Sequence, residues 1–309
     1  MNQTLFHSGE FAAQALAGVA SPHASIRDWM PDQHRTFFAS LPFLPIAVAG
    51  DNGAPTATIL TGPPGFITSS DPATLRIAAQ PDRDDPAAPF LVTGTPVGLL
   101  GIDLASRRRN RANGVLRSVG SDGLIVSVRQ SFGNCPQYIQ TRVWRDAKAL
   151  PDPVHHLSSL DPAARAMVTA ADTFFVATTS GAGTEDAGGV DISHRGGRPG
   201  FIRIAGDALT IPDFRGNHYF NTLGNLMLDP RAALLFVDWQ NGTMLQLQGR
   251  VEIDWNKTDD FDGAERLWRL SVSGGWRRRR AVPLRWSFQD FSPQTLRTGT
   301  WLAAGQTSA

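Results

Sequence analysis

Apolar residues along this chain gather in short runs that end at glycine, proline or aspartate. Four such runs predict buried strands: FLPIAVAG (43–50), PVGLLGID (96–103), TFFVATTS (173–180) and RAALLFVD (231–238). Farther on, Met244, Leu245 and Leu247 alternate with Gln246 and Gln248, which is typical of a strand with one solvated face. Many short strands punctuated in this way predict a mainly β fold, arranged as a barrel or a sandwich.

Helical periodicity is confined to a few segments that flank the predicted strands. Four segments are predicted helices: 10–20, 30–41, 161–171 and 216–228. The third begins with Asp161 as a cap and Pro162 in the first turn. Segment 131–142 is predicted to be a strand that runs into a helix with Pro136 in its first turn. The fold class is therefore α+β, mainly β with flanking helices.

One turn sequence occurs twice, 135 positions apart. Aligning 62–114 with 197–249 without a gap gives eleven identities in 53 positions. They include the turn Gly-x-Pro-Gly-Phe-Ile, a double leucine followed by aspartate three positions on, and a final glycine. A fixed offset over such a span indicates a duplicated domain. We expect an N-terminal helical segment (1–35), a first barrel (36–150) and a second barrel (151–309), with a linker near 151–162.

Composition narrows the class of protein. The 309 residues carry a formal net charge of +1 and are 41% hydrophobic, which disfavours a nucleic-acid or membrane-surface partner. No segment has the length and apolarity of a membrane helix or a secretory signal. Cys135 is the single cysteine, which fits a reducing compartment, and a cytoplasmic location is expected. The seven histidines show no metal-ligand spacing, so no metal is predicted.

The second copy adds charged residues that the first copy lacks. Arg198 stands where the first copy has Pro63, and Arg203 stands where it has Thr68. Two guanidinium groups on one short strand suit the binding of an oxyanion. Gly216 and the following asparagine would begin a helix whose free N–H groups face a phosphate.

These segments resemble the pyridoxamine 5′-phosphate oxidase-like, FMN-binding split-barrel proteins. The resemblance covers about residues 35–290, and it is closest to the branch that joins two barrels in one chain. It is carried by the following stretches: SHRGGRPGFIRI (193–204), DFRGNHYFNTLGNL (213–226), DPRAALLFVDW (229–239), RRRNRANG (107–114), SFGNCPQYIQ (131–140) and PLRW (283–286). It implies two tandem split β-barrels that bind FMN.

The resemblance also implies which residues line the cofactor. In the second barrel these are Arg198, Phe201, Ile202, Arg203, Asp213, Phe214, Gly216, Asn217 and Asn221. Where the oxidase has an Arg-Lys pair at a helix start, this chain has Asn217-His218, or Asn221-Thr222 if the helix is shifted by a turn. From elsewhere, the resemblance adds Arg109, Arg111, Ser131, Asn134, Arg285 and Trp286, with Cys135 and Gln137 as weaker candidates. If 106–114 is extended, Arg107, Arg109 and Arg111 share one face.

Three functions stay open on this basis. The first is an FMN-dependent oxidoreductase that acts on an unidentified small molecule, with a nicotinamide or a protein as electron donor and no residue marked as catalytic acid or base. The second is a non-catalytic carrier or sensor of flavin or haem. The third is a structural member that has lost its cofactor. Whether the flavin would lie within one chain or between the chains of a homodimer is also open.

Overall fold

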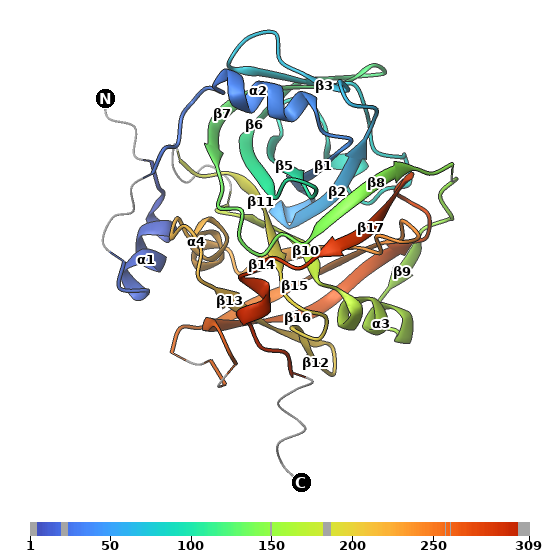
Figure 1. Cartoon of the computed structure of the whole chain (residues 1–309). Coiled ribbons are helices and arrows are strands. Elements are labelled where there is room, and N and C mark those ends of the chain that lie inside the picture. The colour runs from blue at the N-terminus through green and yellow to red at the C-terminus, as the bar shows by residue number, and fades with distance from the viewer. Residues whose placement is uncertain are drawn as a thin grey trace.

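The computed structural model describes residues 5–19, 24–148, 150–181, 187–256, 258–259 and 261–301. Strands dominate the chain and form two large sheets, one above the other in Figure 1. The first sheet has the strand order β2-β1-β5-β6-β7-β4-β3. Its strands are β1 (Phe43–Ala49), β2 (Pro55–Thr61), β3 (Ile67–Thr68), β4 (Thr74–Ile77), β5 (Pro96–Asp103), β6 (Arg108–Gly120) and β7 (Gly123–Gly133).

The second sheet has the strand order β11-β10-β14-β15-β16-β13-β12, and β9 pairs with β16 outside this path. Its strands are β9 (His155–Leu157), β10 (Thr173–Thr179), β11 (Val190–Gly196), β12 (Arg203–Ala205), β13 (Ala208–Phe214), β14 (Arg231–Val237), β15 (Met244–Asp254) and β16 (Ala264–Arg278). The first seven-strand order recurs here when each strand number is raised by nine. The two sheets therefore share one connectivity.

The offset found in the sequence recurs in the strand pairing. Leu100 on β5 pairs with Arg111 on β6, and 135 positions later Leu235 on β14 pairs with Gln246 on β15. The register of β6 against β7 shifts after Asn113, and that of β15 against β16 shifts at the equivalent place, after Gln248. A β-bulge is a position-specific feature, so its recurrence extends the agreement from connectivity to local geometry.

Two of the repeated glycines have a steric reason to be glycine. A Cβ on Gly62 or on Gly197 would lie 2.5 or 2.3 Å from the ring of Phe66 or Phe201, four residues on in each case. The turn therefore closes over a buried phenylalanine. Gly200 inside the second copy of this turn also has a φ of 86°, which other residues rarely adopt.

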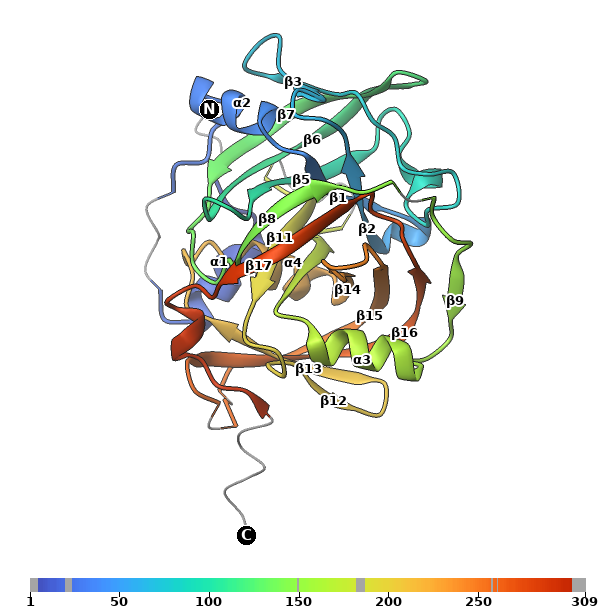
Figure 2. The same cartoon turned by 45° about the vertical axis from the view of Figure 1, so that its right-hand side comes forward.

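A two-stranded ribbon joins the halves. It pairs β8 (Thr141–Asp146), which follows the first sheet, with β17 (Leu284–Asp290), which follows the second. Figure 2 shows these two strands side by side across the front of the molecule, between the sheets. The C-terminal part of the chain is in this way tied to the end of the first half.

The sheets also share a hydrophobic layer. Each has its own core, but a third cluster takes Phe43 and Leu100 from the first sheet and Phe175 and Leu235 from the second. The prediction that Gln246 lies on a solvated face of its strand is wrong for this reason. Its strand is covered by the first sheet, and its amide donates to the Ala57 carbonyl at 2.8 Å.

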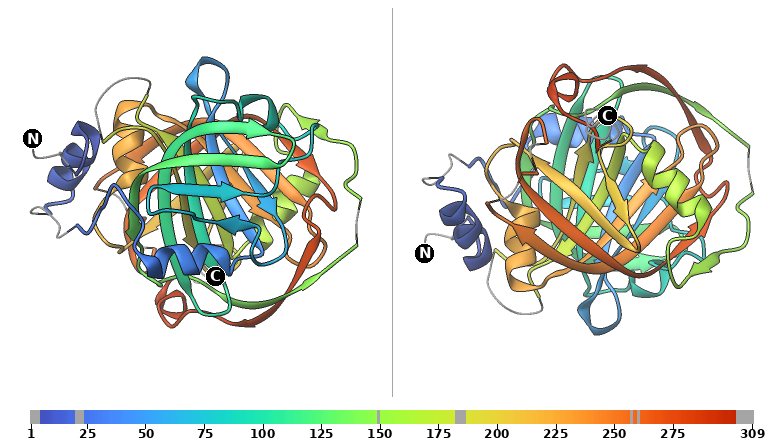
Figure 3. Two further views of the ribbon diagram at one scale, coloured as in Figure 1. Left: turned by 90° about the horizontal axis from the view of Figure 1, so that it is seen from above. Right: turned by 90° about the horizontal axis from the view of Figure 1, so that it is seen from below.

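The helices are α1 (Ser8–Leu16), α2 (Asp32–Ala39), α3 (Pro162–Ala170) and α4 (Asn221–Leu228), with 3₁₀ turns at Asp51–Gly53, Ala88–Phe90 and Thr295–Arg297. The helices predicted within 10–20, 30–41 and 161–171 are confirmed with shifted ends. The N-terminal segment is not one body, because α2 lies on the first sheet whereas α1 lies at the side of the molecule against α4 (Figures 1 and 3). No helix in the described part of the chain is long and apolar enough to cross a membrane.

One predicted element is wrong, and another begins later than predicted. Segment 134–140 is a loop rather than a helix, and it leads directly into β8. The fourth helix begins at Asn221 instead of near 216, because His218 and Phe220 have φ values of 62° and 60° and break the helical path. The predicted linker contains strand β9, which pairs with β16.

Candidate functional site

A cavity of about 120 Å³ lies between the two halves of the molecule. The first half contributes β6 and the loop after β7. The second half contributes β11, the end of β13, the loop after it and the first residues of α4. The cavity thus lies at a junction that neither sheet forms alone.

Arg109 of β6 reaches across this junction to His194 of β11. Its Nη1 donates to the His194 Nδ1 at 3.0 Å. Because Nδ1 accepts this bond, the proton of the neutral imidazole lies on Nε2, which is buried and has no hydrogen-bond partner among the described residues. Burial, and then the charge of Arg109, holds the pKa of His194 well below its ordinary value, so the ring is neutral. The pair therefore offers an unused N–H donor within the wall of the cavity.

The charge of Arg109 is not balanced by a carboxylate. No ion pair to it is formed by the described residues, and its Nε is also buried without a partner. Burial lowers the pKa of its guanidinium to about 10, and the neighbouring Arg111 and Arg195 add to this effect, which Cys135 opposes. An anion bound beside Arg109 would offset both the cost of burying its charge and the repulsion from Arg111 and Arg195.

Arg111, two residues on, lies on the same face of β6, but both of its terminal nitrogens have partners. Its Nη1 pairs with Asp191 Oδ1 at 2.9 Å, and its Nη2 donates to the Ser193 hydroxyl. Asp191 also accepts from Asn113 at 2.7 Å and from Asn225 of α4 at 3.0 Å. These bonds tie β6, β11 and α4 together behind the cavity.

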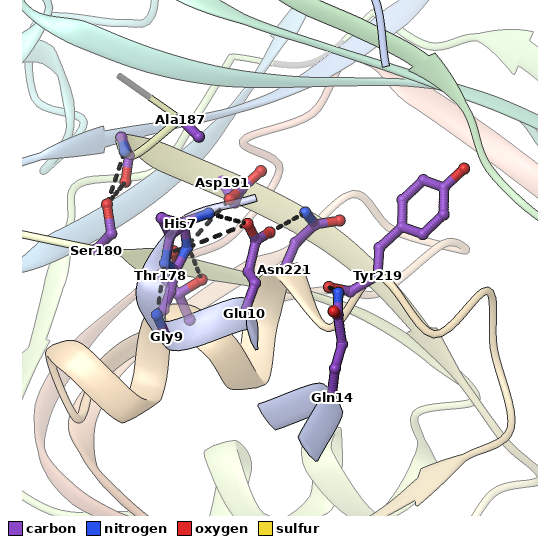
Figure 4. A network of polar contacts seen from close by, with 12 residues as sticks. His7, Gly9, Glu10, Gln14, Thr178, Ser180, Ala187, Asp191, Tyr219 and Asn221 are labelled. Carbon is purple, nitrogen blue, oxygen red and sulfur yellow. Dashed lines mark hydrogen bonds and ion pairs between the residues drawn. The ribbon is translucent and has the colours of Figure 1, made fainter. Parts of the chain in front are cut away.

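Helix α1 extends this network from outside (Figure 4). Glu10 accepts from the Asn221 side chain at 2.5 Å and from the His7 backbone N–H at 3.0 Å. His7 in turn contacts Asn225 at 2.9 Å. Burial, followed by the nearby charge of Asp191, raises the pKa of Glu10 to about 8. Asn221 lines the cavity, so α1 supports one of its walls from behind.

The opposite wall is built around Asp213 at the end of β13. This buried carboxylate accepts from Arg195 and from Arg266, the latter at 2.5 Å. Next to it, the ring of Phe214 stacks on Tyr138 with centroids 5.2 Å apart. Arg195 and Arg266 are thereby fixed, and an aromatic surface lies beside them.

The cavity carries a surplus of positive charge. Among the residues that line it are five arginines and two carboxylates, in order Arg109, Arg111, Arg195, Arg215, Arg266, Asp213 and Glu265. Asp191 neutralises Arg111 from behind, which still leaves two more cations than anions around this space. A site of this kind favours an anionic ligand.

The start of α4 adds polar backbone groups to the same wall. Asn221, Thr222 and Leu223 line the cavity, and the preceding Phe220 provides no side-chain cap. The first N–H groups of a helix have no partner within the helix. The residues that carry these groups in α4 line the cavity, and the positive end of a helix favours an anion further.

Most of the site residues predicted from sequence lie around this cavity. They are Arg109, Arg111, Asn134, Phe201, Asp213, Phe214, Gly216, Asn217 and Asn221, together with the weaker candidate Gln137. Arg107 does not lie with Arg109 and Arg111, because its φ of 54° turns the chain before β6 begins. Its guanidinium instead donates to the carbonyls of Ile139 and Phe291.

Arg198 and Arg203 lie away from the cavity, contrary to the prediction that they bind one anion. Arg198 donates to the carbonyl of Thr298. Arg203 lies on the short edge strand β12, pairs with Asp259 at 2.9 Å and stacks over Trp301 at 4.1 Å. Thr298 and Trp301, at the end of the described chain, thus contact the guanidinium groups of Arg198 and Arg203.

Four further predicted residues are occupied elsewhere. Ile202 is buried in the core of the second sheet, and the Ser131 hydroxyl is 2.8 Å from His34 Nδ1. Arg285 donates to the carbonyls of Val282 and Leu284, and Trp286 packs against Trp239 with centroids 4.9 Å apart. Cys135 is partly exposed on the loop before β8 but does not line the cavity.

Several residues of the cavity were missed. Arg195 lies in the SHRGG stretch that carries the resemblance, and this is the local signal that could have identified it. Arg266 and Tyr138 carry no local signal, since both reach Asp213 or its neighbour from distant parts of the chain. Glu10 lies 211 positions from Asn221, so only the fold could connect them.

The equivalent place at the other junction between the halves is filled by protein side chains. Gln246 stands at the position that corresponds to Arg111, and Thr58 at the one that corresponds to Ser193. Between them lies Asp85, which accepts from Thr58 at 2.6 Å and from Gln246 at 3.4 Å. Burial raises the pKa of this carboxyl above its ordinary value. Here the polar groups are partnered within the chain, unlike those around Arg109.

Comparisons with known proteins return only slight likenesses. No protein-family model and no curated protein matches the chain. Among solved structures, HupZ of Group A Streptococcus matches with 12% identity over 41% of this chain and 96% of its own, at a TM-score of 0.28. A FAD-binding protein from Mesorhizobium loti matches with 14% identity over 41% and 97%, at 0.29.

A third match is broader. The complex of MrkH from K. pneumonia with c-di-GMP matches with 13% identity over 81% of this chain and 87% of its own, at a TM-score of 0.22. Scores of this size are too low to assign a fold or a ligand to the present chain.

Proposed function

We propose that the cavity between the two halves binds FMN and that the protein is a flavin-dependent oxidoreductase acting on a small molecule. The observation that carries the proposal is Arg109, a mostly buried cation with no carboxylate partner among the described residues, beside the start of α4. A phosphate monoester is the anionic part of FMN, and arginine with helix N–H groups is a common way to bind it.

The residues present fit such a group at its anionic end. Arg109 and the first N–H groups of α4 would hold the phosphate, with Asn221 and Thr222 beside them. The volume of about 120 Å³ is small beside the roughly 300–1,000 Å³ of ordinary cofactor pockets. The ring system would therefore lie toward the exposed segment Arg215–Gly216, next to the stacked Tyr138 and Phe214.

A bound flavin would supply hydride transfer, which no side chain can perform. The protein would bind and orient it and would donate hydrogen bonds to its polar edge. The unused His194 Nε2–H suits that role, because its tautomer is fixed by Arg109 and its low pKa keeps it neutral. Asp213 would act through Arg195 and Arg266, whose positions it holds.

We further propose that the two halves are tandem split barrels derived from one duplicated ancestor. The shared strand order, the equal register of β5·β6 and β14·β15, and the bulges at corresponding positions support this proposal. On this view the second half kept the anion site with help from β6, whereas Asp85 filled the corresponding place in the other half.

Spectroscopic titration with FMN tests the proposal. We expect saturable binding that perturbs the visible flavin spectrum, and we expect Arg109→Met to weaken it by roughly 10- to 150-fold, the loss of a charge-assisted hydrogen bond. Arg76→Met is the matched control, because Arg76 is exposed and, within the described part of the chain, forms an ion pair only with Asp122. Its affinity should equal that of the wild type.

The remaining functions give different results in the same assay. Flavin that binds but is not reduced by NADH, NADPH or a protein donor under anaerobic conditions would indicate a carrier or sensor. Binding of haem in place of FMN would indicate that haem is the ligand of this cavity. Failure of FMN to bind at saturating concentration would overturn the flavin proposal and leave the structural alternative.

A further inference from the structure

A second and larger cavity, of about 700 Å³, is lined by residues of the β8–β17 ribbon and of α3. We call it the α3 groove. One wall is a face of α3 made of Ala163, Ala166, Met167 and Ala170. The other wall is aromatic and consists of Trp239, Trp286, Phe288 and Phe291. It shares no lining residue with the Arg109 cavity.

The shape of the groove follows from the sequence of α3. The residues at 163, 166, 167 and 170 are spaced three and four apart, so they share one helix face. Ala164 and Val168 on another face are buried against the sheet. The small side chains on the groove face leave room opposite the aromatic wall. A flat apolar molecule would fit between the two walls.

One end of the groove is polar. Arg142 of β8 and Asp172, just before β10, line it, and the Arg142 Nη2 donates to Asp172 Oδ2 at 2.5 Å. Both residues are buried, with exposed fractions of 4% and 7%. The guanidinium lies 5.2 Å from the Trp239 ring and 5.5 Å from the Phe288 ring. It is thereby placed at the foot of the aromatic wall.

This ion pair leaves one donor and one acceptor unused. The Arg142 Nη1 and the Asp172 Oδ1 are buried and have no hydrogen-bond partner among the described residues. Buried polar atoms of this kind are rarely left unsatisfied in native proteins. A ligand group that accepts at one atom and donates at the next would satisfy both.

The charge of the groove excludes an anion as the best occupant. Arg142 is neutralised by Asp172, Arg277 pairs with Asp161 at 2.6 Å, and Arg279 pairs with Asp152 at 2.8 Å. Each arginine of the groove is therefore balanced, in contrast to Arg109 in the other cavity. A carboxylate ligand would meet Asp172 with repulsion, whereas a neutral amide would not.

We propose that the α3 groove binds a planar aromatic compound that carries a carboxamide. Its ring lies between α3 and the tryptophan wall, its carbonyl oxygen accepts from Arg142, and its N–H donates to Asp172. The proposal is independent of the flavin proposal, since the two cavities have different walls and favour different ligands, a neutral one in the groove and an anionic one beside Arg109.

Indole-3-acetamide and indole-3-acetate are suitable probes, because they differ only in the amide and the carboxylate. Binding to the full chain is measured by calorimetry or ligand-observed NMR. We expect the amide to bind at least about tenfold more tightly than the carboxylate. Equal affinities, a preference for the carboxylate, or no saturable binding of the amide would overturn the proposal.

Two variants test the location and the polar end. Ala166→Phe fills the groove from an exposed helix position and should abolish binding, whereas Thr169→Phe, exposed on the same helix but outside the groove, should not. Asp172→Asn removes the negative charge beside Arg142 and should reverse the preference toward the carboxylate. Circular dichroism of each variant verifies folding. An unchanged amide preference in folded Asp172→Asn would contradict the assigned contact.

Discussion

At the residue scale, the binding role proposed for Arg109 comes with a cost in stability. Its charge is mostly buried and has no carboxylate beside it among the described residues, while Arg111 and Arg195 repel it. Arg109→Met removes this repulsion and loses one hydrogen bond to His194. We expect the unfolding free energy of the ligand-free variant to equal that of the wild type or exceed it by up to about 1 kcal/mol.

Urea unfolding without ligand measures this difference, and FMN titration of the same samples measures binding. Stability that is kept while affinity falls identifies a residue placed for a ligand. A loss of several kcal/mol in the ligand-free variant would instead show that Arg109 serves the fold. Arg76→Met again provides the baseline for removing a surface arginine.

Glu10 makes the stability of the α1 contact depend on pH. Its pKa in the folded protein is raised from 4.5 to about 8, first by burial and then by Asp191. The folded state therefore favours the neutral carboxyl. The contribution of the neutral carboxyl to the unfolding free energy is complete below about pH 4.5 and is lost as the pH rises through 8. We expect the unfolding free energy to fall between pH 6 and pH 9, and Glu10→Gln to flatten this decline.

Urea unfolding at pH 6, 7.5 and 9 checks the prediction. Glu252→Gln serves as the control, because that carboxylate is exposed on β15 and should leave the pH profile unchanged. If Glu10→Gln has the same slope as the wild type over this range, the neutral carboxyl is not what stabilises the α1 contact.

At the element scale, α1 and α4 meet at two glycines. A Cβ on Gly9 would lie 2.2 Å from the Gly224 carbonyl oxygen, and one on Gly224 would lie 2.6 Å from Cγ of Glu10. Alanine favours a helix over glycine by about 1 kcal/mol, but a backbone clash of this size outweighs that gain. We expect Gly9→Ala to lower the unfolding free energy by about 1–3 kcal/mol.

The same substitution should also weaken FMN binding, since Glu10 would no longer hold Asn221 at the cavity. Ala15→Gly is a matched control on the exposed side of α1, and it should lower stability by about 1 kcal/mol through propensity without affecting binding. Binding that is unchanged in Gly9→Ala would show that α1 does not support the cavity wall.

The elements that sequence could predict are those whose cause is local. The Gly-x-Pro-Gly-Phe turn is visible because Gly197 must admit the ring of Phe201, four residues away. The start of α4 was misplaced because nothing in the composition of 216–220 announces positive φ at His218 and Phe220. Arg198 and Arg203 were misassigned because their partners, Thr298 and Asp259, are distant in sequence.

At the scale of the whole molecule, two similar halves have unlike junctions. The junction around Arg109 has an arginine surplus to which both halves contribute, whereas the corresponding junction is closed by Asp85 and Thr58 of the first half and Gln246 of the second. The asymmetry follows from substitutions at matched positions, such as Arg111 and Gln246. A single chain would therefore supply both walls of one flavin site, and the corresponding junction would not form a second one.

This asymmetry predicts the binding stoichiometry. We expect one FMN for each chain, at any protein concentration, because the corresponding junction has its polar groups satisfied by Asp85 and has no free cation among the described residues. Titration at protein concentrations far above the dissociation constant, combined with light scattering, gives the number of flavins per chain in each oligomeric state. Arg109→Met should weaken this binding by the same factor of roughly 10 to 150, whereas Gln246→Met, located at the corresponding junction, should leave both the affinity and the stoichiometry of one unchanged. Two flavins per chain would contradict the closed junction, and one flavin per two chains would move the site to an interface between copies.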